Sequence, residues 1–145
     1  MDYKKLIDEI SAYNFKTEQL YSEWAKLNGM SYYAFMVLYV LGKNQPCTQK
    51  FISEELLLPK QTVNTVIKDL IKKGFAELSA GRNQKEKLVL LTADGIFHAE
   101  EVMAETYRLE EKILRRMGKK ECLMIIQSTI KFAEIFEEEL HEYRK

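Results

Sequence analysis

The chain has 145 residues, and this length favours one tightly knit unit over two separate domains. Leu, Ile, Val and Phe are too abundant for a disordered chain, and the scarcity of Pro and Gly favours a helix-rich fold. The 22 basic and 22 acidic residues cancel, which excludes a uniformly basic coat, so any surface for nucleic acid must be local.

The chain also lacks the features of a secreted or membrane-bound protein. Its first ten residues alternate charged and apolar side chains, unlike a secretory signal. The longest apolar run, Ala34 to Leu41, is much shorter than the ~20 residues that span a bilayer. Two cysteines, Cys47 and Cys122, cannot form a disulfide framework. We therefore expect a soluble, cytoplasmic protein without membrane contact.

Four helices are predicted in the first half of the chain. Apolar residues at steps of three or four predict a long amphipathic first helix, which Asn28-Gly29 ends. Ser31 and Thr48 are favoured N-caps for the second and third helices. Pro59 fits the first position of the fourth helix, and Gly74 stops it. The predicted ranges are 2–27, 31–43, 48–56 and 59–73.

A β-hairpin is predicted after the fourth helix. Residues 75–79 and 88–91 are short, apolar and partly alternating, and the tract 80–87 between them is polar and contains Gly. Two helices joined by a tight turn and followed by a small hairpin form a winged helix-turn-helix. The fold class is therefore mostly α with a small β-hairpin wing, and residues 31–92 form the DNA-binding lobe.

Two long helices are predicted after the hairpin. Thr92 caps the first, which runs to about Met117, and Gly118 separates it from the last, over residues 119–143. The segments 1–28 and 95–145 carry broad apolar stripes that a small winged-helix lobe could not cover. We expect them to form a homodimer, which would place two recognition helices about 34–36 Å apart. The candidate dimer residues are Leu6, Ile10, Leu123, Ile126, Ile130, Phe136 and Leu140.

The fourth helix has the composition of a DNA-recognition helix. Its polar and basic residues lie opposite an apolar face that holds it to the body. Gln and Asn can pair bidentately with adenine, and Thr can contact a thymine methyl or a phosphate. The segment 59–87 has seven basic and three acidic residues in a neutral chain. The candidate DNA-binding residues are Thr48, Lys50, Lys60, Gln61, Thr62, Asn64, Thr65, Lys68, Arg82 and Lys85.

Three segments, in order along the chain, resemble the MarR family of transcriptional regulators. Residues 48–56 resemble the family's third helix, and Leu58 to Gly74 resembles its recognition helix and stop. Leu91-Thr92-Ala93-Asp94-Gly95 is similar to the Leu-Thr-x-x-Gly that follows the family's wing. The resemblance implies a triangular homodimer that binds pseudo-palindromic operators and often responds to a small ligand. A ligand would lie between the dimer helices and the DNA-binding lobe, where Tyr13, Trp24 and Tyr33 are candidates.

The chain departs from the family pattern at two places. The family's wing usually carries Asp-x-Arg, in which the Asp braces an Arg for the minor groove, whereas the matching positions here are Asn83 and Lys85. Lys fits a narrow minor groove less well than Arg, and the neighbouring Arg82 is a candidate to replace it. Pro59 stands where the family often has Ser, which removes a hydroxyl contact to phosphate.

Other functions have weaker support in the sequence. His98 and His141 show no metal-ligand spacing, and no nucleophile elbow or phosphate loop is present. We expect no enzyme activity, no metal and no cofactor. Cys47 and Cys122 are interpreted as small buried side chains rather than redox sensors. The main reading is a ligand-responsive repressor, in which an effector changes the spacing of the two lobes. The alternative is a winged-helix protein-interaction module that does not bind DNA.

Overall fold

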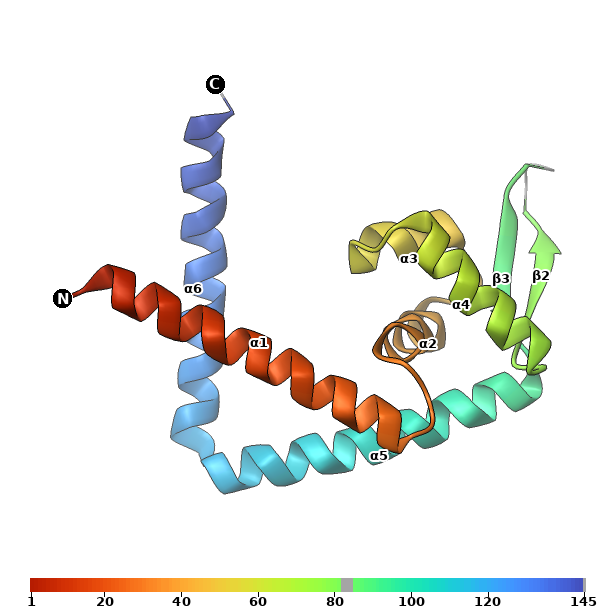
Figure 1. Ribbon diagram of the computed structural model, residues 1–145, viewed down its shortest axis with the longest axis horizontal. Helices are drawn as coiled ribbons and strands as arrows, with labels where there is room; N and C mark the ends of the chain where they lie inside the picture. Colours follow the sequence, from red (N-terminus) through yellow and green to blue (C-terminus); the bar gives the residue numbers. More distant parts are fainter. Residues whose placement is uncertain (82–84, 145) are drawn as a thin grey trace. The chain divides into compact units, whose positions relative to one another are not determined.

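The computed structural model of the protein describes residues 1–81 and 85–144 (Figure 1). It divides into two compact units, Met1–Met103 and Ala104–Lys145, which are described separately below. The helices are α1 (Tyr3–Leu27), α2 (Tyr32–Asn44), α3 (Gln49–Leu56), α4 (Lys60–Lys72), α5 (Ala93–Met117) and α6 (Lys119–Tyr143). The strands are β1 (Cys47–Thr48), β2 (Ala76–Ala80) and β3 (Lys87–Leu91). The predicted fold class, mostly α with a small hairpin wing, is confirmed.

Side-chain caps set the starts of the first three helices. The side chains of Asp2, Ser31 and Thr48 each accept a hydrogen bond from the backbone N–H three residues later, at 3.1 Å in every case. These bonds satisfy donors that have no partner within the helix. Ser31 and Thr48 therefore cap the helices that the sequence assigned to them. Asp2 lies outside its helix as the N-cap.

Pro59 does not occupy the position predicted for it. Its φ of −56° suits a helix, but its ψ of 142° is extended, so it is the N-cap and α4 begins at Lys60. The Pro59 carbonyl accepts the first bond of the helix from the N–H of Val63, at 3.2 Å. Pro59 supplies no side-chain cap.

A third strand, which the sequence did not predict, completes the sheet. The strand order is β1-β3-β2, with both pairings antiparallel, so β3 is central. Cys47 pairs with Val89 and Thr48 with Leu88. The side-chain Oε1 of Gln45 also accepts a hydrogen bond from the N–H of Leu91, at 2.7 Å. The wing is thus tied to the segment that leads into α3.

One apolar core holds the first unit together. Helix α2 lies at its centre because most of its circumference is apolar, and α3, α4, the sheet and α5 pack around it. The buried core residues are Ala25, Phe35, Val37, Leu38, Val40, Leu41, Cys47, Ile52, Val63, Ile67, Leu70, Ala76, Val89, Leu91, Ala99 and Val102. All of them lie before residue 104, so the core belongs to the first unit.

The start of α5 is fastened to the start of the hairpin. The carbonyl of Phe75 accepts a hydrogen bond from the N–H of Thr92 at 3.0 Å, and the Thr92 hydroxyl donates to the carbonyl of Gly74 at 2.6 Å. A Cβ on Gly95 would lie 1.8 Å from the Phe75 carbonyl oxygen. Glycine is therefore required at position 95 for this close approach. These contacts give a physical reason for the Thr-x-x-Gly spacing.

The second unit contains the end of α5 and all of α6. Gly118, with φ of 95°, separates the two helices, as the sequence predicted. Helix α6 has no buried residue. None of the helices in the described part of the chain is both long enough and apolar enough to cross a membrane.

Candidate nucleic-acid interface

Helix α4 presents a polar face to solvent because its opposite face is fixed in the core. Val63 and Ile67 are fully buried and Leu70 is nearly so, at spacings of four and three residues. Lys60, Gln61, Thr65 and Lys68 are exposed, whereas Thr62 and Asn64 are half-buried. Lys60, Gln61 and Thr65 lie in the first two turns of the helix, which is the part that a recognition helix presents to base edges.

Two of the polar side chains on α4 have local constraints. The Thr65 hydroxyl donates to the carbonyl of Gln61 at 2.9 Å, which leaves its oxygen free to accept a further bond. Asp69 forms an ion pair with Lys73 at 2.8 Å. Within the described part of the chain, Lys60 and Lys68 form no ion pair and are available to an anion.

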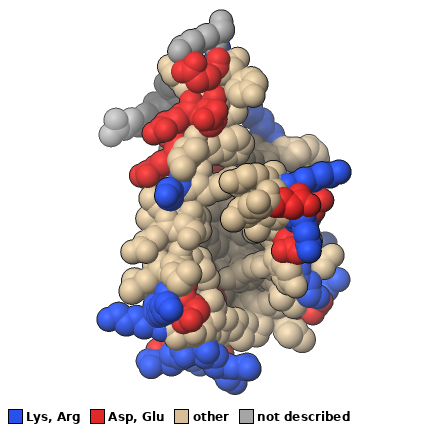
Figure 2. Space-filling view, turned by 90° about the vertical axis from the view of Figure 1, so that its left-hand side faces the viewer, with Lys and Arg blue, Asp and Glu red and all other residues tan. Residues whose placement is uncertain are grey.

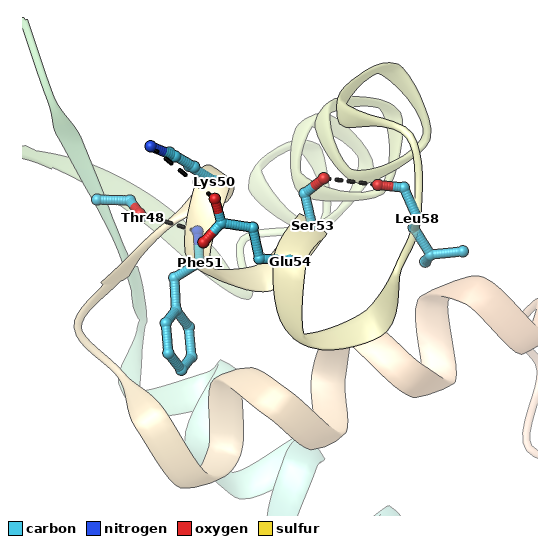
Figure 3. A network of polar contacts seen from close by, with 6 residues as sticks. All are labelled: Thr48, Lys50, Phe51, Ser53, Glu54 and Leu58. Carbon is cyan, nitrogen blue, oxygen red and sulfur yellow. Dashed lines mark hydrogen bonds and ion pairs between the residues drawn. The ribbon is translucent and has the colours of Figure 1, made fainter. Parts of the chain in front are cut away.

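The turn between α3 and α4 is held by a side chain that the sequence analysis did not assign. The Ser53 hydroxyl donates to the carbonyl of Leu58 at 2.5 Å, and the N–H of Leu58 donates to the Ser53 carbonyl at 3.1 Å (Figure 3). Between them, Leu57 has left-handed φ and ψ of 51° and 40° and is 90% exposed. These bonds fix the angle at which α4 leaves α3.

Thr48 and Lys50 lie at the start of α3 (Figure 3). The Thr48 side chain caps α3, and its backbone pairs with Leu88 as part of β1. Its position is therefore fixed by both the helix and the sheet. Lys50 is exposed and lies 3.9 Å from Glu54, a distance that makes a weak surface ion pair. Thr48 lies opposite Leu88, near the start of the wing strand β3.

The wing hairpin carries one further predicted site residue that the structure describes, Lys85. Strands β2 and β3 pair from Ala76 opposite Leu91 to Ala80 opposite Lys87, and the N–H of Gly81 donates to the Glu86 carbonyl at 2.8 Å. Lys85 is exposed. The predicted site residue Arg82 lies outside the described residues, as does Asn83.

The residues predicted to form the dimer and the effector pocket have different surroundings. The seven dimer candidates are all exposed in the single chain. Of the effector candidates, Tyr13 is 73% exposed, Tyr33 is also exposed, and Trp24 is half-buried against the core. A hollow of about 190 Å³ in the first unit is bordered by Asn28, Met30, Lys73 and His98 among others, and none of the three candidates lines it.

Cys47, Cys122 and His98 have different surroundings. Burial raises the pKa of the Cys47 thiol, which disfavours the reactive thiolate. Cys122, expected to be buried, is only half-buried, and its Sγ lies 3.5 Å from the Leu114 carbonyl. His98 stacks on Phe75 with ring centroids 4.5 Å apart. Among the described residues, no three His, Cys, Asp or Glu side chains are grouped to hold a metal ion.

Comparisons with a family model, with a known relative and with solved structures all find transcriptional regulators. A sequence model of the MarR family matches residues 28–85. The chain is 36% identical over 78 residues to YwoH of Bacillus subtilis, an uncharacterized HTH-type transcriptional regulator; this match covers 54% of the chain and 57% of YwoH. The chain thus spans little more than half the length of that relative.

Solved structures of MarR regulators share the fold. NMB1585, a MarR family regulator from Neisseria meningitidis, has a TM-score of 0.76 and 27% identity, covering 94% of this chain and 97% of its own. Staphylococcus aureus MarR, solved with salicylate and kanamycin, has a TM-score of 0.77 and 17% identity over 94% and 93% of the two chains. Streptococcus pneumoniae FabT, solved in complex with DNA, has a TM-score of 0.75 and 20% identity, covering 94% of this chain and 99% of its own.

Proposed function

We propose that this chain, which is similar to MarR family regulators, is a DNA-binding transcriptional repressor that acts as a homodimer on a pseudo-palindromic operator. One observation carries the proposal. The buried residues of α4 fix the helix so that Lys60, Gln61 and Lys68 point to solvent together. A helix held in this way can enter the major groove with its polar residues facing the base edges.

Each part of the site has a distinct role in this proposal. Gln61 reads base edges, and Thr65 contacts a thymine methyl or a phosphate. Lys60 and Lys68 neutralise phosphates and release counterions. Thr48 and Lys50 contact the backbone from the start of α3, and Lys85, with Arg82, does so from the wing. The solved complex of FabT with DNA supports this use of the fold.

The repressor is proposed to respond to a small molecule. The Staphylococcus aureus MarR structure holds salicylate and kanamycin, which supports a ligand-responsive fold in this family. In the proposed mechanism, the ligand binds more tightly to a dimer whose lobes are spaced incorrectly for two successive major grooves. The DNA-competent population then falls, and the operator is released. The same lobe spacing with and without the inducing ligand would contradict this mechanism.

The test is fluorescence anisotropy with the duplex immediately upstream of the protein's own gene, beside a scrambled duplex, at several salt concentrations. Tight and sequence-dependent binding is expected, with log affinity falling by roughly 0.9 per neutralised phosphate as log salt rises. Gln61→Ala should weaken the free energy of binding to the specific duplex by about 1–3 kcal/mol and relax discrimination at one base pair.

Lysine variants provide the matched control for this experiment. Lys68→Ala should weaken binding to both duplexes and reduce the salt slope by about one. Lys26→Ala removes another exposed lysine, in the last turn of α1, and should change neither value. Weak binding to both duplexes with a flat salt dependence would favour the protein-interaction module instead.

A further inference from the structure

Charged residues are sorted by sign along the second unit. Residues 112–120, around the bend at Gly118, contain five basic residues and no acidic one. Residues 122–130 contain no charged residue, and residues 134–142 contain five Glu and no Lys or Arg. In Figure 2, Asp and Glu gather near the top of the view and Lys and Arg at its bottom, while both signs are mixed along the right-hand side. Helix α6 thus has a basic end, an uncharged middle and an acidic end.

This order opposes the dipole of α6 itself. A helix is stabilised by negative charge near its N-terminus and positive charge near its C-terminus. Glu121 in the first turn and His141 in the last follow that rule. Lys119 and Lys120 in the first turn, and the run 137–139 with Glu142 near the end, act against it. The net arrangement makes the isolated helix less stable, so its cause lies outside the helix.

The uncharged middle of α6 lacks a cover. Ile126 is 56% exposed and Ile130 is 53% exposed, and Leu123 beside them is also exposed. Apolar area of this size left in water forgoes about 25 cal/mol for each Å² that a partner could bury. The charge pattern at the two ends indicates which partner fits.

One face of α6 combines the apolar middle with opposite charges at its ends. Lys119 and Glu137 are 18 residues apart, which is about five whole turns, so they point in the same direction. Ile126 and Ile130 lie between them on the same face. Neither Lys119 nor Glu137 forms an ion pair within the described part of the chain. We call these four residues the α6 stripe.

We propose that the α6 stripe pairs antiparallel with the stripe of a second copy, with its two-fold axis at the level of Ser128. In this register Lys119 faces the partner's Glu137, and Ile126 faces the partner's Ile130, at both ends of the pair. The proposal rests on the homodimer proposed above. It adds that the charges at the two ends of the α6 stripe set the register of that dimer and select a second copy as the partner. A parallel pair would instead place like charges together, which the charge pattern disfavours.

The other faces of α6 fit this role less well. The face that begins at Glu121 ends at Glu139, so antiparallel pairing would bring like charges together. The face of Lys120 and Glu138 has opposite charges at its ends but carries Lys131 in its middle. An unpaired charge in an apolar contact is costly to bury. The α6 stripe avoids both problems.

The basic end also offers a concave surface to the partner. A hollow of about 550 Å³ lies between the end of α5 and the start of α6, and Leu114, Arg115, Lys119 and Cys122 are among its lining residues. Arg115 is already paired with Glu111, at 2.6 Å. Lys119 is therefore the cation of this hollow that remains available to the acidic end of a second α6.

The test uses two full-length variants of opposite design, Lys119→Glu and Glu137→Lys. In each homodimer, both contacts between stripes would join like charges, so the dimer dissociation constant should rise at least about tenfold at low salt. Mixing the two variants restores opposite charges at both contacts. Native mass spectrometry of the mixture should then show heterodimer well above the statistical half.

Control variants separate this register from other causes. Lys120→Glu and Glu138→Lys make the same charge changes one residue along, on the neighbouring face, and should mix statistically. If the charges acted only within one chain, Lys119→Glu and Glu137→Lys would stabilise α6, since each follows the helix dipole. Circular dichroism measures helix content, and recovery of the heterodimer on mixing demonstrates that the variants fold.

The outcomes distinguish this proposal from the proposed function. A dimeric wild-type protein whose stripe variants mix statistically would overturn the register and leave the homodimer standing. A wild-type protein that is monomeric by light scattering at micromolar concentration would overturn the homodimer and the register together. Selective heterodimer formation by the stripe variants, with statistical mixing of the controls, supports the register.

Discussion

The two units of the chain bury apolar surface in different ways. The first unit encloses every residue of the apolar core, from Ala25 to Val102. The second unit has large apolar side chains along both of its helices, yet almost all of them are exposed, and α6 buries none. Helices α2, α3 and α4 and the sheet bury their apolar faces within one chain, whereas the second unit does not, and neither does the first part of α1, where Leu6 and Ile10 are exposed. We infer that the second unit depends on a second copy for its stability.

This contrast separates two kinds of apolar residue that look alike in sequence. Ile67 and Ile126 both follow helical spacing, and both lie on helices of good amphipathic pattern. Ile67 is fully buried and Ile126 is 56% exposed. Helical spacing predicts that a residue packs against another apolar surface. It does not predict whether that surface belongs to the same chain or to a second one.

The largest expected effect comes from disrupting the contact between the start of α5 and the start of the hairpin in the first unit. Gly95→Ala places a Cβ 1.8 Å from the Phe75 carbonyl oxygen, a backbone atom that cannot move without disturbing the hairpin. The free energy of unfolding should fall by more than about 4 kcal/mol, measured by urea denaturation. Gly42→Ala is the control, because its Cβ would meet only Ala99, at 3.9 Å. That change should be neutral or stabilise by up to about 1 kcal/mol. Equal effects would contradict the proposed close approach.

A smaller effect tests what covers the second unit. Ile126→Ala should lower stability by about 1–3 kcal/mol at high protein concentration, because it removes buried apolar area from the dimer. At concentrations where the dimer dissociates, the loss should be within about 0.5 kcal/mol, as for an exposed site. Ile67→Ala is the control, and it should cost about 2–5 kcal/mol at every concentration. A loss at position 126 that is independent of concentration would mean that its cover comes from the same chain.

The smallest effect compares the two thiols. Burial within the first unit raises the pKa of Cys47, so its thiol loses its proton at a higher pH than an ordinary cysteine does. Iodoacetamide should label Cys47 at least about tenfold more slowly than the unfolded chain at every protein concentration. Labelling of the half-buried Cys122 should be faster, and it should slow as concentration rises and the dimer forms. Mass spectrometry after brief labelling distinguishes the sites. Fast labelling of Cys47 in the folded protein would contradict its burial.

Local chemistry in the sequence predicts most of the helices. Each long helix has three-to-four-residue spacing, and caps such as Ser31 and Thr48 act within three residues of themselves. Features that depend on distant segments were missed. Strand β1 has two residues, too few to show any periodicity, and it exists because the edge of β3 is there to pair with. Pro59 was placed one position too far into its helix, because φ suits both positions and ψ decides between them.

The candidate site shows the same division. The sequence separates the polar and buried faces of α4, because that separation is written in the helical spacing. It does not predict that Ser53 ties the turn to Leu58, since bonds across five residues through a left-handed turn follow no helical pattern. It also does not predict that Thr62 and Asn64 are half-buried, which depends on neighbouring elements.

The short strand β1 also has a topological consequence. Its pairing with β3 joins Cys47 to Val89, so the whole helix-turn-helix lies inside one closed loop of the chain. The entropy of closing such a loop grows only slowly with its length, so a few bonds at its neck can hold a large segment. Two paired residues and the Gln45 side chain form that neck. The helices that would read DNA are therefore held twice, by their buried residues in the core and by the pairing that closes this loop.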